Sequence, residues 1–259
     1  MSTPTLSGIT LVNGVRDAGV PADDLGLTRG WSVFETLRTY GRTPFRLPQH
    51  LDRLKRSAEL LHVPMPNMDL LKEDIQAAID TDVWIRITLT ASGNRIVVSR
   101  RVDPARIGRP ITVASVIMPP SPHLPAAAKH GCRTPWIMAA RHHGTEEIFI
   151  LDDQRHILEA NRSNVIAFVD GCLWTPPTQG QCLDGITRQA MLQAAADANL
   201  PVRIAPLPVD TPFDELYVCS SLKELAPVAT LDGVKIGGGP QGKRLHAAFR
   251  ALVAKESHN

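Results

Sequence analysis

The sequence predicts an α+β (mixed α/β) fold made of two domains. Between residues 83 and 90, apolar side chains occupy every second position, which is typical of a strand with one buried face. In residues 51–61 and 245–253, apolar side chains recur at helical spacing instead. Residues 118–125 contain four prolines, which exclude a helix and a central strand there. Helices, half-buried strands and a proline-rich divider together indicate two domains that each combine both kinds of element.

The proline-rich stretch sets the predicted domain boundaries. We expect a smaller N-terminal α/β domain over residues 1–117, an interdomain linker over 118–125 and a larger C-terminal domain over 126–259. The chain has 259 residues, of which 43% are apolar, and this is enough to bury two modest cores.

The N-terminal domain is predicted to combine a helix with an antiparallel sheet. The helix spans about residues 48–61 and has a proline at its start. The strand at 83–90 follows, and the apolar segments 96–102 and 111–118 are its expected partners. The face of this strand that carries Arg86 stays available for contacts outside the core.

The C-terminal domain is predicted to hold a second, antiparallel-rich sheet. Short apolar segments separated by turns that contain Asp and Gly favour hairpin pairing. The expected elements are strands at 147–151, 157–159, 165–169 and 172–174, a helix at 187–199, a strand at 215–219 and a last helix that buries Leu245, Phe249 and Val253.

The charge balance argues against nucleic acid and membranes as partners. The chain has 28 Lys and Arg against 26 Asp and Glu, without the basic excess that binding to a phosphate backbone needs. No apolar run approaches the roughly 20 residues of a membrane-spanning helix. A secretory signal has Lys or Arg before its apolar segment, and here neither precedes the short apolar stretch near the N-terminus. We therefore expect a soluble protein with small-molecule partners.

The cysteines and histidines show no spacing typical of a metal site or a disulfide framework. The four cysteines are Cys132, Cys172, Cys182 and Cys219. None of them forms a CxxC pair, and His142 and His143, which with His130 might suggest a metal, are adjacent and would point in different directions on a helix. We expect no metal and a reducing, cytoplasmic location.

Lys129 is the first candidate for covalent chemistry. It follows three alanines and precedes His130, in a stretch of low charge at the start of the predicted C-terminal domain. Partial desolvation there would lower the pKa of Lys129 and leave a neutral amine for Schiff-base formation. A solvated surface lysine is the alternative interpretation.

Glu159 is a second candidate because it ends a predicted strand and precedes the polar run 160–164. A buried carboxylate at this point could pair with a protonated ring nitrogen, the interaction that makes a pyridine ring an electron sink. The alternative is an ordinary acid in a turn.

A phosphate site is predicted where a helix follows Gly185. The backbone N–H groups of Ile186 and Thr187, with the Thr187 hydroxyl, could bind a phosphate at the helix N-terminus. Alternatively, Thr187 only caps the helix. Ser220 and Ser221, at the end of a predicted strand, could add hydroxyl donors or could begin a turn.

The glycine-rich run at 237–242 formally matches a dinucleotide-binding motif. Pro240 interrupts the match and no βαβ unit surrounds it, so we expect a flexible turn.

Seven short motifs occur along the chain in an order that is more specific for one protein family than any single motif. They lie at residues 29–38, 44–54, 159–164, 174–177, 183–188, 214–221 and 226–228. Together they resemble the class IV aminotransferase family, the fold type IV group of pyridoxal phosphate enzymes, over nearly the whole chain.

The resemblance implies a two-domain fold type IV architecture, a homodimer and pyridoxal 5'-phosphate as cofactor, held by the C-terminal domain. It gives Lys129 the covalent link to the cofactor and Glu159 the contact with the pyridine nitrogen. With Ser220 added from the residue pattern, the expected ligands of the cofactor phosphate are Arg53, Ile186, Thr187, Ser220 and Ser221.

Within this family, two features resemble lyases. Thr36 matches a threonine whose hydroxyl can assist proton transfer, and Lys129, Arg133 and Trp136 match a compact K-x3-R-x2-aromatic pattern. We therefore expect a 4-amino-4-deoxychorismate lyase, which gives 4-aminobenzoate and pyruvate for folate biosynthesis.

The main alternative is a transaminase that acts on D-amino acids or branched-chain amino acids. Arg38 or Arg86 would bind the substrate carboxylate, with Phe34 beside the substrate. A catalytically degraded relative with a structural or regulatory role is a third possibility, and the retention of Lys129 and Glu159 argues against it.

One departure from the family pattern lies at residues 30–32. Most members have Gly-Asp-Gly there, whereas this chain has Gly-Trp-Ser. We expect a bulkier and less acidic loop near the substrate entrance.

Overall fold

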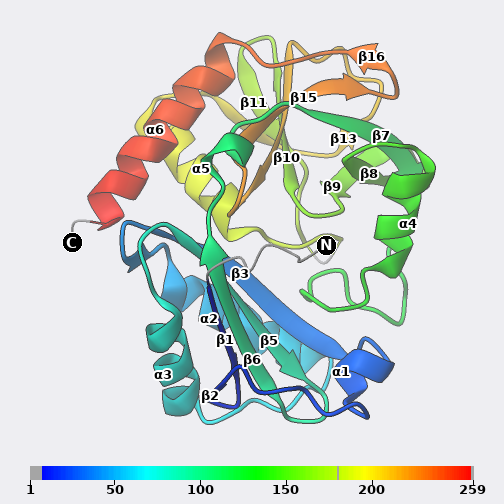
Figure 1. Cartoon of the computed structure of the whole chain (residues 1–259). Coiled ribbons are helices and arrows are strands. Elements are labelled where there is room, and N and C mark those ends of the chain that lie inside the picture. The colour runs from blue at the N-terminus through cyan, green and yellow to red at the C-terminus, as the bar shows by residue number, and fades with distance from the viewer. Residues whose placement is uncertain (1–7, 180, 258–259) are drawn as a thin grey trace, which may run out of the picture. The chain divides into compact units, whose positions relative to one another are not determined.

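The computed structural model describes residues 8–179 and 181–257 and divides into two compact units (Figure 1). The first unit extends to Asp103 and also includes Ala128–Cys132. The second unit consists of Pro104–Ala127 and the chain from Arg133 onward. Each unit contains both helices and a sheet, so the predicted α+β class is confirmed.

The observed boundary differs from the predicted one on both sides of the proline-rich stretch. Strand β7 (Ile111–Ile117) pairs in parallel with β8 (Glu147–Leu151) and β15 (Glu224–Leu231) of the second sheet, not with the strand at 83–90 as predicted. It therefore belongs to the second unit, and a predicted division after residue 117 is too late by one strand. Ala128–Cys132, expected in the C-terminal domain, returns to the first unit because its backbone bonds to β3.

The first unit is built on a six-stranded sheet with the order β2-β1-β6-β5-β3-β4, in which every pair is antiparallel. The strands are β1 (Gly8–Val12), β2 (Val15–Arg16), β3 (Ser32–Tyr40), β4 (Thr43–Pro44), β5 (Val83–Thr90) and β6 (Arg95–Arg101). The helices are α1 (Leu25–Thr28), α2 (Leu47–Leu60) and α3 (Met68–Ala78). Helix α2 matches the predicted helix to within one residue at each end.

The core of the first unit lies between one face of this sheet and helices α2 and α3. The side chains Val83, Ile85, Ile87 and Leu89 on β5 are all buried there, as the alternation predicts. Leu54 on α2 and Leu71 on α3 close the core from the helix side. The other face of β5, with Arg86, lies outside this core.

The second unit is built on a ten-stranded mixed sheet with the main order β12-β11-β10-β14-β15-β7-β8-β9-β13, and β16 pairs with β15. Besides β7, the strands are β8 (Glu147–Leu151), β9 (His156–Ala160), β10 (Asn164–Val169), β11 (Cys172–Thr175), β12 (Val202–Ile204), β13 (Leu207–Pro208), β14 (Glu215–Ser220), β15 (Glu224–Leu231) and β16 (Val234–Lys235). The predicted hairpins β8–β9 and β10–β11 are antiparallel, as expected. The pairs β7–β8, β7–β15 and β11–β12 are parallel.

The helices of the second unit are α4 (Thr134–His142), α5 (Ile186–Asp197) and α6 (Pro240–Ser257), with a short 3-10 turn at Pro104–Arg106. The glycine-rich run is not a turn throughout, because Pro240 begins α6. A Cβ on Gly242 would lie 2.0 Å from the Tyr217 hydroxyl, so close packing explains this glycine.

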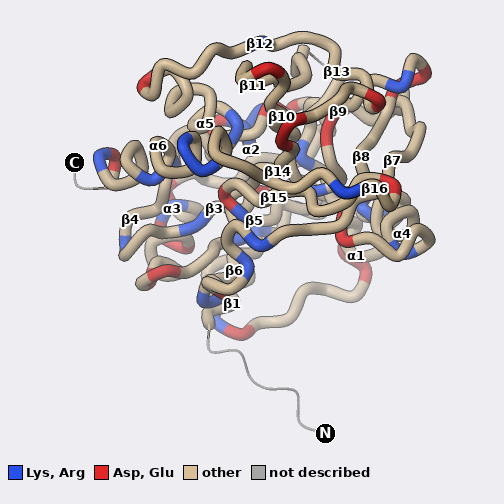
Figure 2. The backbone as a smooth tube through the Cα atoms, turned by 90° about the horizontal axis from the view of Figure 1, so that it is seen from above, with Lys and Arg blue, Asp and Glu red and all other residues tan. Residues whose placement is uncertain are grey.

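Positions with charged side chains of both signs are scattered along the backbone (Figure 2). Within the described ranges, no helix has both the length and the apolar character needed to cross a bilayer.

Candidate functional site

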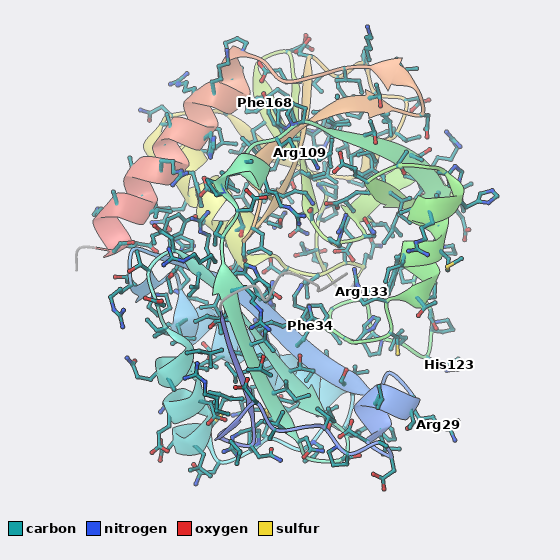
Figure 3. All side chains as sticks on the ribbon, viewed as in Figure 1. Arg29, Phe34, Arg109, His123, Arg133 and Phe168 are labelled. Atoms are coloured by element: carbon teal, nitrogen blue, oxygen red, sulfur yellow. The ribbon has the colours of Figure 1, made fainter. Side chains whose placement is uncertain are left out.

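Strand β3 presents two chemically different faces. Val33 and Leu37 point into the core of the first unit, so the alternate residue Phe34 lies on the other face (Figure 3). Thr36 and Arg38 share that face by the same alternation along β3. Thr36 pairs with Arg86 of β5 in the antiparallel register, so these two residues are direct neighbours. The structure therefore brings four predicted site residues, Phe34, Thr36, Arg38 and Arg86, onto one face of one sheet.

Lys129 is held beside this face by main-chain hydrogen bonds. Its C=O accepts from the Phe34 N–H at 2.9 Å, and its N–H donates to the Ser57 hydroxyl at 3.0 Å. The Lys129 ammonium lies 4.8 Å from the centre of the Phe34 ring, and the Arg86 guanidinium lies 3.7 Å from the same centre. A lysine amine, a guanidinium and an aromatic surface are thus adjacent in the first unit.

The Gly30–Ser32 loop, which departs from the family pattern, contacts the Lys129 segment. The Gly131 N–H donates to the Ser32 C=O at 2.8 Å, and a Cβ on Gly131 would lie 2.2 Å from the Ser32 hydroxyl. Trp31 is 43% exposed and its indole N–H donates to the Leu61 C=O at the end of α2. The bulky residue is therefore fixed against the helix.

Arg53, predicted to bind the cofactor phosphate, is part of a buried cluster on the inner face of β3. Its Nε donates to Glu35 Oε1 at 2.7 Å, and a second nitrogen donates to Oε2 at 2.8 Å. His50 Nδ1 lies 2.7 Å from Glu35 Oε2, and all three side chains are at most 6% exposed. The two acceptor oxygens of Glu35 therefore fix the guanidinium plane of Arg53.

The surroundings lower the pKa of both Glu35 and His50. Burial acts to raise the pKa of Glu35, but the charge and hydrogen bonds of Arg53 and the hydrogen bond to His50 outweigh it, so the pKa lies well below its usual range. Burial lowers the pKa of His50; the hydrogen bond and charge of Glu35 act to raise it, but burial, helped by the charges of Arg53 and Lys129, outweighs them. Glu35 and His50 were not among the site residues predicted from the sequence. A charged residue at an inward position of an apolar strand was the available signal.

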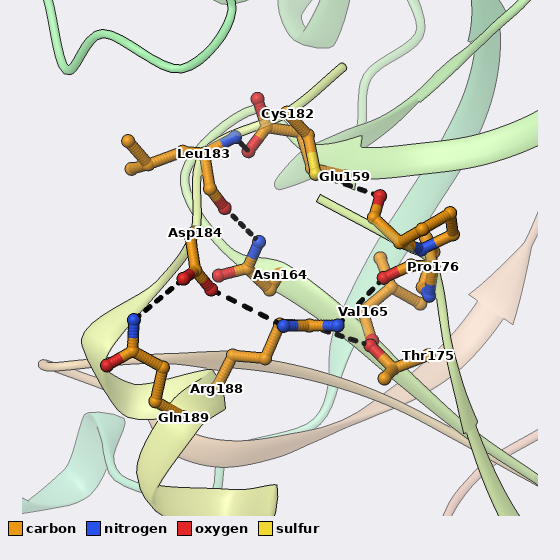
Figure 4. Close-up of polar contacts among 11 residues, drawn as sticks. Glu159, Asn164, Val165, Thr175, Pro176, Cys182, Leu183, Asp184, Arg188 and Gln189 are labelled. Atoms are coloured by element: carbon orange, nitrogen blue, oxygen red, sulfur yellow. Dashed lines mark hydrogen bonds and ion pairs between the residues drawn. The ribbon is translucent and has the colours of Figure 1, made fainter. Parts of the chain in front are cut away.

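In the second unit, Glu159 on β9 contacts the loop that leads into α5 (Figure 4). The Leu183 N–H donates to Glu159 Oε2 at 3.3 Å. The Leu183 C=O accepts from the Asn164 amide at 2.8 Å, which joins the loop to the start of β10. Glu159 is partly exposed, and the alternative of an isolated acid in a turn does not apply because it lies within β9.

Arg188 fixes the same loop and was not singled out from the sequence. It is 5% exposed, and it donates to the Thr175 hydroxyl at 3.1 Å and to the Pro176 C=O at 2.9 Å. It also pairs with Asp184 at 3.4 Å (Figure 4). Arg188 thereby connects the end of β11 to the first turn of α5.

The N-terminus of α5 has the features of an anion site. The helix begins at Ile186, its N-cap is Gly185, and no side chain of the described residues hydrogen-bonds as a cap there. Thr187 is the second helical residue, so the alternative of Thr187 as N-cap is wrong. The N–H groups of the first turn have no intrahelical acceptor, and the helix dipole adds positive potential. Ile186 and Thr187 therefore lie where a phosphate would be bound.

We expect Gly185→Ala to disturb this site. A Cβ on Gly185 would lie 1.8 Å from the Asn164 side-chain oxygen, so the loop or Asn164 must move. The affinity for pyridoxal 5'-phosphate should fall by about tenfold or more, with a lower melting temperature. Gly19→Ala is the matched control, since nothing lies within 4 Å of its added Cβ. Equal cofactor affinity in the two variants would contradict this role of the loop.

The remaining predicted phosphate ligands lie at the end of β14. Ser220 is the last residue of β14, and Ser221 begins the turn into β15. Cys219, the residue before Ser220, pairs with Asn164 across the sheet. Asn164 in turn contacts the loop before α5, so the serines lie at the end of a strand whose last residues pair with the strand that contacts this loop.

The donor sets of the two units fit pyridoxal 5'-phosphate in kind. The second unit offers helix N–H groups and serine hydroxyls for a phosphate, together with a carboxylate that can accept from a ring nitrogen. The first unit offers an anchored lysine amine for an aldehyde. Within the described residues, no group of three or more His, Cys, Asp or Glu side chains could hold a metal ion.

Comparison with known proteins gives one consistent family. The sequence profile of the amino-transferase class IV family matches residues 32–231. The branched-chain-amino-acid aminotransferase of Salmonella typhimurium is 28% identical over 285 residues, covering 94% of this chain and 91% of that protein. The bifunctional aminodeoxychorismate lyase / D-amino acid transaminase of Mycobacterium tuberculosis is 28% identical over 276 residues, covering 90% of this chain and 93% of that protein.

A solved structure agrees in fold. The crystal structure of the Escherichia coli branched-chain amino acid aminotransferase superposes with a TM-score of 0.84 at 27% identity, covering 96% of each chain. The match extends over both units.

Proposed function

Because the chain belongs to the amino-transferase class IV family of pyridoxal phosphate-dependent enzymes, we propose that it is a transaminase of apolar D-amino acids or branched-chain amino acids. One observation carries the proposal: the Lys129 ammonium and the Arg86 guanidinium both lie over the Phe34 ring. This places an amine, a carboxylate-binding group and an apolar surface next to one another, which are the three groups that such an amino acid needs.

The roles follow from the chemistry of each side chain. Bound pyridoxal 5'-phosphate supplies an electron sink for the electron pair left at the substrate Cα. The Lys129 amine takes the Cα proton and later returns a proton, as a general base and acid. Glu159 would accept a hydrogen bond from the ring nitrogen of the bound cofactor, which would keep that nitrogen protonated.

The other predicted residues bind and orient. Ile186, Thr187, Ser220 and Ser221 hold the phosphate through N–H groups and hydroxyls. By the family resemblance, Arg53, whose guanidinium plane is fixed by Glu35, would add a positive charge for the cofactor phosphate. Arg86 binds the substrate carboxylate, with Arg38 on the same face as a second cation.

The relatives support this activity better than the lyase that the sequence analysis favoured. Most of them are named as branched-chain-amino-acid aminotransferases. The lyase stays a second candidate because Thr36, the residue that suggested it, lies partly exposed beside Arg86. In addition, the Mycobacterium tuberculosis relative is named for both activities.

The test is a comparison of substrates on the purified enzyme with added cofactor. L-leucine or D-alanine with 2-oxoglutarate should give the corresponding keto acid, while L-aspartate should react poorly. Accumulation of 4-aminobenzoate from aminodeoxychorismate, without turnover of any amino acid, would replace the transaminase by the lyase.

Arg86→Ala gives a sharper test of carboxylate binding. We expect KM for the amino acid to rise by about tenfold to a hundredfold, since a charge-assisted hydrogen bond is lost. Arg101→Ala, an exposed arginine on β6, is the matched control and should leave KM unchanged. An unchanged KM in both variants would remove Arg86 from the substrate site.

We also propose that the enzyme works as a homodimer in the cytoplasm. The dimer is expected from the family resemblance. Sedimentation equilibrium would test it by measuring the mass of the enzyme in solution. The four cysteines are free thiols, which suits a reducing compartment.

A further inference from the structure

The turn between β14 and β15 determines where the two serines of the proposed phosphate site point. A serine hydroxyl is one bond from Cβ, so its position depends directly on the backbone. Within the turn, the Lys223 N–H donates to the Ser220 C=O at 3.2 Å. The Gly108 N–H donates to the Lys223 C=O at 3.0 Å. Lys223 ends this turn and Glu224 begins β15, and neither residue is a predicted ligand of the cofactor.

Glu224 has an unfavourable backbone conformation. Its φ is +56°, in the left-handed region that residues with a Cβ rarely adopt, and its side chain is fully buried. A glycine would adopt this φ without strain. The glutamate must therefore be held there by its side chain.

The side chain of Glu224 ends in an ion-pair cluster with α6. Arg250 Nε lies 2.7 Å from Glu224 Oε2, and His246 Nε2 lies 2.7 Å from the same oxygen. A buried carboxylate with two such partners resists displacement, since any movement leaves the charge desolvated and unpaired. The cluster fixes the end of the turn to the last helix.

Lys223 fixes the same turn to a different element. Its ammonium pairs with Glu147 Oε1 on β8, and the Ser163 hydroxyl donates to that oxygen at 3.0 Å. Glu147 is fully buried and Lys223 is 18% exposed. Two consecutive residues thus tie the turn to β8 and to α6.

We propose that Lys223 and Glu224 are positioning residues of the phosphate site, which hold the turn in the conformation that lets Ser221 bind the cofactor phosphate. The inference rests on the proposed function, because it takes Ser221 as a phosphate ligand. Neither residue has to touch the cofactor. Their effect should therefore be on the recognition of phosphate and not on the recognition of the pyridine ring.

The experiment compares two ligands that differ only in the phosphate. The full-length apoenzyme is titrated with pyridoxal 5'-phosphate and with pyridoxal, and the visible absorbance of the bound ligand gives each Kd. We expect Glu224→Gln and Lys223→Met to weaken binding of pyridoxal 5'-phosphate by about tenfold, as for one lost hydrogen bond to a charged group. Their affinity for pyridoxal should stay at the wild-type value. Lys223→Met decides the question if Glu224→Gln does not fold.

Asp232→Asn is the matched control. Asp232 follows the other end of β15, has a φ of +50°, and accepts from the Ser115 N–H and hydroxyl at 2.7 and 2.6 Å. This variant should lose thermal stability while its preference for the phosphorylated ligand stays at the wild-type value. It separates a general loss of stability from a loss of phosphate recognition.

Ser221→Ala tests the proposed phosphate ligand separately from the positioning role of Lys223 and Glu224. If Ser221→Ala loses phosphate preference and both positioning variants keep it, the inference is overturned and the phosphate site stands. If Ser221→Ala keeps the preference, the assignment of Ser221 and the inference fail together. If the Lys223 and Glu224 variants bind pyridoxal 5'-phosphate and pyridoxal more weakly by the same factor, the inference is also overturned, because that result indicates a purely structural role.

Discussion

Substitution of Lys129 by alanine should abolish covalent attachment of the cofactor and lower turnover by about a thousandfold or more, since a general base and nucleophile is lost. Folding should survive. The hydrogen bonds that anchor the segment, from the Phe34 N–H and to the Ser57 hydroxyl, use main-chain atoms of residue 129, and alanine retains them. Borohydride reduction followed by intact-mass measurement tests the attachment, and circular dichroism tests the fold.

The control for this variant is Lys55→Ala, an exposed lysine on α2. It should bind cofactor covalently like the wild type. If borohydride still adds the mass of the cofactor to the Lys129→Ala protein, another lysine is the nucleophile. Lys223, the ion-pair partner of Glu147, would be examined next.

Glu35→Gln should destabilise the first unit by about 3–5 kcal/mol, because it removes the carboxylate charge that faces the buried guanidinium of Arg53. Arg53 is 5% exposed and Glu35 is fully buried, so water cannot compensate. Urea unfolding measures the loss. Glu59→Gln, at an exposed position on the same helix as Arg53, is the control and should change stability by less than about 0.5 kcal/mol.

The same variant should change the pH dependence of stability. The pKa of Glu35 is lowered in the folded protein, so the unfolded chain takes up its proton first as the pH falls. The contribution of Glu35 is therefore present above the ordinary pKa of 4.5 and decreases below it. His50 also has a lowered pKa and adds a loss through its ordinary value of 6.5, so we confine the comparison to lower pH.

From about pH 5 to 3, the wild type should lose stability more steeply than Glu35→Gln. Parallel curves would show that Glu35 is not ionised in the folded state. The double variant Glu35→Gln/Arg53→Met provides a further check, since removal of the buried charge should restore part of the lost stability.

The sequence predicted helices and strands well where the spacing of apolar residues alone distinguishes a helix from a strand. The alternation along β5 predicted its buried face, and helix α2 begins and ends within one residue of the prediction. The motif at residues 183–188 predicted a helix entered through Gly185, and α5 begins there. In each case, the information lies in neighbouring residues, because periodicity and helix starts are local properties.

Pairing partners depend on distant parts of the chain, and there the sequence was not sufficient. Residues 111–117 read as an apolar strand, which is correct, but nothing in the segment says that it pairs with β8 and β15 and not with β5. The return of Ala128–Cys132 to the first unit has the same origin, since it depends on hydrogen bonds to β3.

The sequence by itself determined the family, the cofactor, the fold class and the candidate residues, because motifs of fixed order and local period carry that information. Only the tertiary structure decided what surrounds those residues. It put Glu35 and His50 around Arg53, set Lys129 and Arg86 over the Phe34 ring, and tied the serine turn to Glu147 and α6. These contacts join residues that are far apart in the chain, and such contacts form only when whole elements pack together.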